Sequence, residues 1–147
     1  MSELAEFKDD FSLFIEAGFI AVKQLDETSA LRLFDAAQVL NPDHSAPKIG
    51  IGYVALNKLE VKQATKIFTE VTEKEPTNWL AQTFLGICYL LTKPKRKKGE
   101  KLIHEAIEKT TDPTVKSLGT ISLEWAEKDL YKAGAPFFAP KETASTE

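Results

Sequence analysis

The sequence predicts an all-α protein made of about three helical hairpins, because small, aromatic and proline residues recur at one interval. Four residue types recur 34 residues apart, at Gly18, Gly52 and Gly86; Ala30 and Ala64; Phe34 and Phe68; and Pro42 and Pro76. A fixed period of this length is the sequence signature of a helical repeat array. No single repeat buries its apolar faces alone, so each hairpin needs its neighbours.

The period divides the chain into repeats and a closing helix. We expect one domain over residues 1–132, with repeats at about 11–44, 45–78 and 79–113 and a capping helix at about 114–132. Asn41-Pro42 and Glu75-Pro76 end the second helices of the first two repeats, because proline cannot continue a helix. Glycine and alanine allow the two helices of a hairpin to approach closely, and the large residues fill the space between hairpins.

The third repeat departs from the pattern after Tyr89. It keeps the segment Leu85-Gly86-Ile87-Cys88-Tyr89, but its inter-helix turn holds residues 93–98 and is longer than the turns before it. Its second helix is expected from about Gly99 to Lys109.

The last helix is expected to begin at Asp112-Pro113, which reads as an N-cap followed by proline at the first helical position. Five apolar residues of this helix are expected to pack against the preceding helices: Val115, Leu118, Ile121, Trp125 and Leu130. Terminal repeats need a polar outer face, which this helix supplies. Residues 133–147 are rich in Gly, Pro, Ser and Thr and are expected to be flexible. Phe137-Phe138 is the one feature of this tail that could dock elsewhere.

Composition excludes several classes of protein. The 147 residues are 43% apolar and 28% charged, and the formal net charge is −3, so the chain is not built to coat nucleic acid. Cys88 is the only cysteine, which excludes a disulfide within the chain and favours a reducing compartment. The acidic N-terminus lacks the apolar core of a secretory signal, and no stretch is long enough to span a bilayer. We therefore expect a cytoplasmic protein.

Two short motifs imitate catalytic or cofactor sites. Residues 50–55 match the dinucleotide pattern G-x-G-x-x-A, but that pattern requires a preceding strand, and the period already accounts for Gly52. His104-Glu105 is half of a zinc-protease motif without its second histidine, and His44 lies far away in the sequence. We expect no enzyme activity, no cofactor and no metal site.

A basic run occupies residues 93–98, as Lys-Pro-Lys-Arg-Lys-Lys. Such a run can serve nuclear import or bind an anionic ligand, but blocks of like charge usually stay in water. Its flanks offer no interleaved aromatic residues that would stack on bases. We interpret it as a solvated loop and assign it no role.

The period and the order of residue types resemble the tetratricopeptide repeat (TPR), whose pattern is W-x-x-L-G-x-x-Y…A-x-x-x-F…P. The resemblance covers residues 11–132 and implies a superhelix that binds a polypeptide on its concave face, lined mainly by the first helix of each repeat. The groove residues implied here are Ile15, Phe19, Val22, Ile49, Tyr53, Leu56, Leu80, Phe84, Ile87 and Leu90. Three lining positions align in each repeat, at 15, 19 and 22, at 49, 53 and 56, and at 83, 87 and 90. Thr83 is the only polar residue among these nine.

An apolar groove narrows the kind of partner. One TPR class holds acidic chaperone tails with a clamp of basic and amide groups, and Ile15, Phe19 and Tyr53 stand where that clamp is needed. An apolar groove instead suits the apolar face of an amphipathic helix. Some of these side chains could face a neighbouring helix. An exposed strip would be covered by a partner, by self-association or by the chain's own ends.

The size, the three repeats with a capping helix and the apolar groove together resemble the small TPR-type chaperones of bacterial type III secretion, which are virulence-associated protein-transport systems. Within that group the chain is most similar to the needle-subunit chaperones. The resemblance implies that the groove cradles the C-terminal helix of the needle subunit, prevents premature polymerisation and is assisted by a small co-chaperone. A translocator chaperone, which usually binds an extended segment, and a TPR scaffold or assembly factor are the alternatives.

Overall fold

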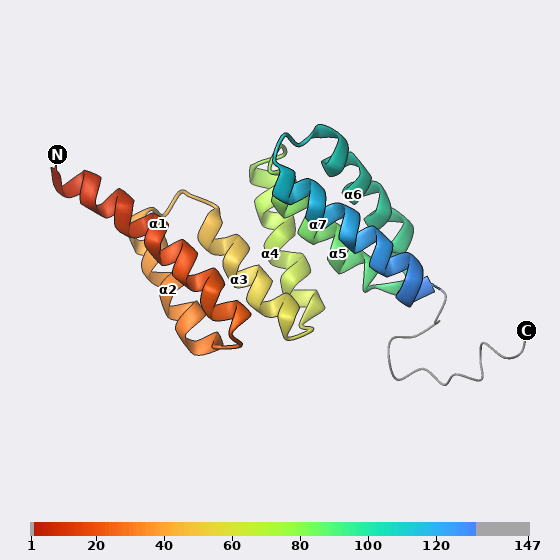
Figure 1. The fold of residues 1–147 in the computed structure, drawn as a ribbon, viewed down its shortest axis with the longest axis horizontal. Coiled ribbons are helices and arrows are strands. Elements are labelled where there is room, and N and C mark those ends of the chain that lie inside the picture. The colour runs from red at the N-terminus through yellow and green to blue at the C-terminus, as the bar shows by residue number, and fades with distance from the viewer. Residues whose placement is uncertain (1, 132–147) are drawn as a thin grey trace, which may run out of the picture. The chain divides into compact units, whose positions relative to one another are not determined.

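The structure is a computed structural model that describes the backbone of residues 2–131 and the side chains of residues 10–130 (Figure 1). Residues 2–131 form seven α-helices and no β-strand, which confirms the all-α prediction. The helices are α1 (Ser2–Lys23), α2 (Glu27–Leu40), α3 (Ala46–Asn57), α4 (Val61–Lys74), α5 (Trp79–Leu90), α6 (Arg96–Lys109) and α7 (Pro113–Trp125). A short 3-10 helix, η1 (Lys93–Lys95), precedes α6, and a π-helical segment, η2 (Ala126–Tyr131), follows α7.

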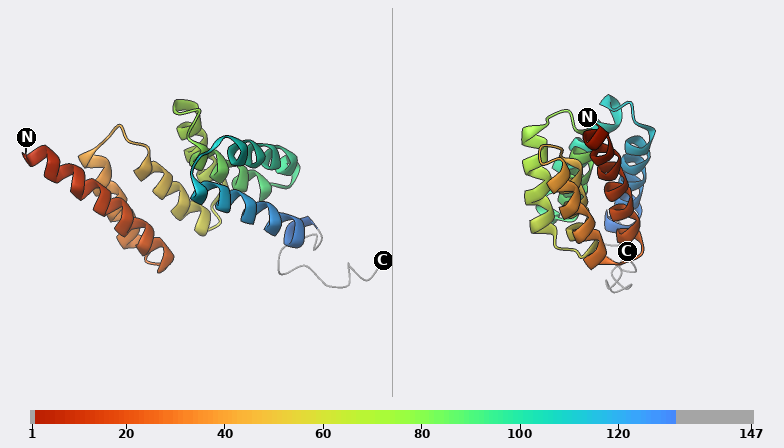
Figure 2. Two further views of the ribbon diagram at one scale, coloured as in Figure 1. Left: turned by 45° about the horizontal axis from the view of Figure 1, so that its top comes forward. Right: turned by 90° about the vertical axis from the view of Figure 1, so that its left-hand side faces the viewer.

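The chain divides into two compact units, Met1–Ala81 and Gln82–Glu147. The first unit contains α1 to α4 and the first residues of α5. The second contains the rest of α5 together with α6, α7 and η2. In the first unit, the α1–α2 turn and the α3–α4 turn lie at the same end (Figure 1 and Figure 2).

The two hairpins of the first unit have equivalent turns, 34 residues apart. The N–H of Asp26 donates to the carbonyl oxygen of Ala21 at 2.8 Å, and the N–H of Glu60 donates to that of Ala55 at 2.9 Å. The second helices also end alike, because the N–H groups of Asn41 and Glu75 both donate to the carbonyl four residues earlier. The sequence period is therefore a period of backbone geometry in this unit.

Each of these turns places a leucine in the left-handed backbone region. Leu25 has φ 62° and Leu59 has φ 59°. For an L-residue with a bulky side chain this conformation costs about 1–2 kcal/mol, and glycine or asparagine is the usual occupant. The pattern of small residues did not reveal these turns, because the residue at the turn is large in both repeats.

The core of the first unit depends on the fit of an aromatic ring against glycine. A Cβ atom at Gly18 of α1 would lie 2.5 Å from the ring of Phe34 in α2, and one at Gly50 of α3 would lie 2.4 Å from it. Phe34 is fully buried. The ring therefore sits where α1 and α3 both lack a side chain, and it holds these two helices against α2.

The Gly-x-Gly motif of α3 is explained by packing. Gly50 meets Phe34, whereas a Cβ atom at Gly52 would lie 2.7 Å from the ring of Phe68 in α4. Two residues span about 200° around a helix, so the two glycines face different neighbours. The motif lies inside α3, and the element before α3 is the helix α2, not the strand that a dinucleotide site requires. The repeat explained Gly52 in advance, whereas the role of Gly50 was missed.

In the second unit, α5 and α6 also approach through glycine. A Cβ atom at Gly86 would lie 2.5 Å from Ile103 and 2.9 Å from the carbonyl oxygen of Gly99. The predicted start of α6 at about Gly99 was wrong, because the helix begins at Arg96. The Arg96 Nε–H donates to the carbonyl oxygen of Leu90 at 2.9 Å, which ties the first turn of α6 to the end of α5.

The closing helix begins as predicted. Asp112 Oδ1 accepts from the N–H of Thr114 at 2.8 Å, and Pro113 occupies the first turn. Val115 and Leu130 are buried, but the expected packing of Ile121 was wrong, since that side chain is 62% exposed. The predicted tail, including Phe137-Phe138, lies outside the described residues.

Gly52→Leu should destabilise the protein strongly, because its side chain would collide with the buried ring of Phe68. Overpacking of this kind costs about 1–3 kcal/mol or more. Urea unfolding followed by circular dichroism measures the loss. Lys48→Leu, which adds the same side chain at an exposed position of α3, is the control and should unfold like the parent. Equal midpoints for Gly52→Leu and the parent would refute the close approach.

Candidate binding surface

Two aromatic side chains lie side by side on the first helices of the two hairpins in the first unit. The ring centroids of Phe19 in α1 and Tyr53 in α3 are 5.8 Å apart. Phe19 also contacts the buried ring of Phe34 edge to face, at 5.1 Å. Each aromatic directly follows a glycine of the repeat, Gly18 or Gly52, so the packing of those glycines sets where the rings lie.

The other predicted groove residues of the first unit divide between core and surface. Val22 and Ile49 are buried, at 6% and 4% exposure, so their side chains hold the helices together. Ile15 is half-buried and packs against the cluster that contains Val22. Leu56 and Leu80 are also half-buried. Ile15 lies one helical turn before Phe19 on α1, and Leu56 lies one turn after Tyr53 on α3, so each shares a helix face with one ring of the aromatic pair.

The apolar surface of α1 is wider than the predicted groove. Leu13 is 59% exposed and Ile20 is 54% exposed. They are seven residues apart, so they lie on one face of the helix. Their seven-residue spacing is visible in the sequence, but the repeat pattern predicts only the positions that line a groove, and these two residues are not among them.

Three predicted groove residues belong to the second unit. Phe84 and Leu90 are buried, with Leu90 fully so. Leu90 forms a cluster with Ile103 of α6 and with Ala126 and Leu130 of η2, and the half-buried Ile87 packs against this cluster. The C-terminal end of the described chain thus covers Leu90.

A polar network joins the end of α4 to the turn before α3. Glu75 accepts hydrogen bonds from the Ser45 hydroxyl and from the Asn78 side-chain amide, both at 2.9 Å. The side-chain oxygen Oδ1 of Asn78 in turn accepts from the backbone N–H of Ala81 at the start of α5. These bonds, that of Asn78 first, hold the pKa of Glu75 below its ordinary value of 4.5. The network fixes the two helix ends.

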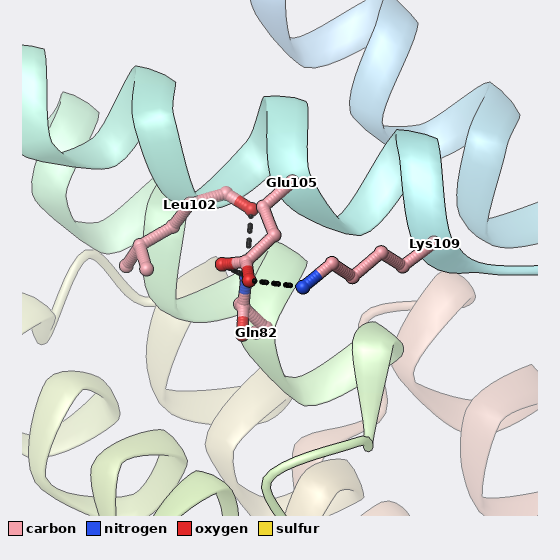
Figure 3. Close-up of polar contacts among 4 residues, drawn as sticks. All are labelled: Gln82, Leu102, Glu105 and Lys109. Carbon is pink, nitrogen blue, oxygen red and sulfur yellow. Dashed lines mark hydrogen bonds and ion pairs between the residues drawn. The ribbon is translucent and has the colours of Figure 1, made fainter.

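A second polar network lies in the second unit and was not predicted (Figure 3). The amide nitrogen of Gln82 on α5 donates to the Leu102 carbonyl oxygen at 3.0 Å and to Glu105 Oε1 at 2.9 Å. Lys109 donates to the other carboxylate oxygen of Glu105 at 3.0 Å. The pKa of Glu105 is lowered, mainly by Lys109 and then by Gln82. A buried glutamine satisfied by the facing helix stabilises the α5–α6 pair.

The basic run does not form one loop. Residues 93–95 are η1, and the run continues into the first turn of α6. The ammonium groups of Lys95 and Lys98 each lie 5.3 Å from the ring centroid of Tyr89, which is a cation–π distance. Two cations share one ring, so part of this charge packs on the protein and the rest stays in water.

Within residues 2–131, no cluster of His, Cys, Asp and Glu could hold a metal ion, and no helix is long and apolar enough to cross a membrane. Comparison with models of protein families, with curated proteins and with solved structures found no match.

Stability should fall in acid through Glu75. Its folded-state pKa is lowered, so the unfolded chain takes up the proton first. The stabilisation is complete above the ordinary value of 4.5 and is lost as the pH falls through the lower folded-state pKa. Glu75→Gln should flatten this part of the pH dependence of the unfolding free energy, measured with urea. Glu73→Gln removes the same charge from an exposed site of α4 and should leave the slope as in the parent.

Proposed function

We propose that this protein is a TPR-type chaperone that binds an amphipathic helix of a partner polypeptide. The partner we propose is the needle subunit of a type III secretion system, held in the cytoplasm so that it does not polymerise prematurely. The observation that carries the binding proposal is the aromatic pair, Phe19 and Tyr53, placed at equivalent positions of two successive hairpins with their rings 5.8 Å apart. The repeated turns and Gly–Phe contacts support the TPR assignment.

The proposed binding mode follows from the chemistry of this surface. Phe19 and Tyr53 are the large side chains at its centre, and Ile15 and Leu56 lie one helical turn from them on α1 and α3. An amphipathic helix presents apolar residues at i, i+3, i+4 and i+7, and such a stripe can lie along a row of apolar side chains. Aromatic residues in the centre of an interface carry much of its energy. Buried residues such as Val22 and Ile49 hold this surface in place from below.

The proposed mechanism is protection by occupancy. A helical subunit that polymerises through an apolar helix exposes that helix whenever it is alone, and such a strip is prone to association. Binding on the chaperone covers the helix and removes it from the polymerising pool. A small co-chaperone that shields apolar surface of the chaperone itself belongs to the same proposal. The apolar residues Leu13 and Ile20, exposed on α1, are surface of this kind.

The partner is identified by co-purification from the native cell followed by mass spectrometry, with a needle subunit as the expected result. Circular dichroism of the complex should show a helical partner. An extended bound segment would instead favour a translocator chaperone, and a permanent stoichiometric assembly would favour a scaffold.

Phe19→Ala and Tyr53→Ala should each weaken binding of this partner by about 2 kcal/mol, a loss of more than tenfold, because both rings are central to the surface. Titration by calorimetry at low and high salt measures the effect. Lys93→Ser/Lys97→Ser/Lys101→Ser should change the affinity little, because all three side chains are exposed and screened.

The control for lost packing is Leu33→Ala. Leu33 packs against the same core cluster as Phe19 but lies on α2, so this variant should lose stability without losing affinity. If the lysine variant abolishes binding while the two aromatic variants retain it, the partner is an acidic surface and the apolar mode is wrong.

A further inference from the structure

The two hairpin turns need a residue in the left-handed region, but nothing in the fold requires that this residue be an exposed leucine. Leu25 and Leu59 have positive φ, and their side chains are 88% and 67% exposed. A left-handed turn residue is most stable as glycine or asparagine. A leucine there strains the backbone and exposes an apolar side chain to water as well. Neither property stabilises the hairpin.

The same end of the first unit also carries a small apolar hollow. It has a volume of about 120 Å³ and is lined by Val22, Leu25 and Val54, with Glu27, Asn57 and Lys58 around them. This volume is of the same order as the roughly 150 Å³ cavity that accommodates one small apolar group. Leu59 directly follows Lys58, which lines the hollow and whose ammonium group contacts Glu27 at 2.9 Å, so the exposed leucine is next in the chain to the lining of the hollow.

The charges of this face are balanced. Within three positions of either leucine the sequence places three cations and three carboxylates, namely Lys23, Asp26, Glu27, Lys58, Glu60 and Lys62. Lys58 is paired with both Glu27 and Glu60, at 2.9 Å and 3.3 Å. A face with both signs and no net charge does not repel a copy of itself, and it offers nothing specific to a polyanion.

We propose that this face, the turn face formed by Leu25, Leu59 and the hollow that Leu25 and Lys58 help to line, is a two-fold interface between two copies of this chain. A two-fold interface brings one patch against itself, so the patch must be self-complementary. This face carries both a protruding apolar side chain, Leu59, and an apolar hollow that can receive it. Leu59 of each copy inserts beside Val22 and Val54 of the other. Neither Phe19 nor Tyr53 lines the hollow, although Val22 and Val54 belong to the core cluster against which both rings pack.

The test is sedimentation velocity of the full chain across a concentration range, with thermal unfolding in parallel. Leu25→Asn/Leu59→Asn should weaken the dimer at least tenfold, while the melting temperature stays unchanged or rises, because asparagine tolerates positive φ. Leu25→Met/Leu59→Met keeps both the strain and the apolar side chains and should retain the dimer. Val39→Asn, which alters another exposed apolar residue at the far end of α2, should also retain it.

Three results would overturn the proposal: a parent chain that is monomeric at every concentration, an asparagine variant that dimerises like the parent, or a loss of the dimer in Val39→Asn as well. Phe19→Ala/Tyr53→Ala separates this interface from the proposed function. If that variant dissociates the dimer and the asparagine variant does not, self-association uses the aromatic surface instead. If the dimer behaves as proposed but no partner helix binds, only the chaperone assignment fails.

Discussion

The first unit depends on one packing arrangement, a phenylalanine ring seated where two helices have no side chain. Phe34 of α2 occupies the space next to both Gly18 and Gly50, and it is fully buried. Because the ring contacts α1 and α3 together, it sets how closely and at which register these helices run. Any larger residue at either glycine would have to displace backbone or the ring, and protein interiors are packed too densely to absorb that freely.

The candidate surface is a consequence of this arrangement. In a helix, consecutive side chains are about 100° apart, so a residue that follows an inward-facing glycine lies beside the packed face and not within it. Phe19 and Tyr53 both follow such glycines, and their rings meet at 5.8 Å. The core thus positions the aromatic pair without enclosing it, while Val22 and Ile49 on the same helices are enclosed. On each of these helices, a buried residue (Val22 or Ile49) stabilises the core, and a nearby aromatic residue (Phe19 or Tyr53) belongs to the proposed binding surface.

The second unit reaches a similar result with different residues. Its helices approach through Gly86 and Gly99, and the large side chain that faces Gly86 is Ile103 instead of a phenylalanine. A buried glutamine, Gln82, is satisfied by α6, which adds a directional contact to the apolar core. The C-terminal segment supplies Ala126 and Leu130 to cover Leu90. Leu90, a predicted groove residue on α5, is therefore covered by a later segment of the same chain.

The sequence by itself determined the all-α class, the ends of α2 and α4 before their prolines and the N-cap at Asp112, because these depend on local rules of capping and proline. It did not determine which apolar side chains remain exposed. The periodic pattern predicts the same lining role for Val22 and Phe19, and it predicts that Ile121 packs against a neighbour. The exposure of each side chain depends instead on which residues of the neighbouring helices lie opposite it. The same limit applies to the start of α6, which the contact of Arg96 with Leu90 decides. Only the tertiary structure revealed the strained turns at Leu25 and Leu59, because the two leucines recur at the 34-residue period but leucine is not a residue type that indicates a positive φ.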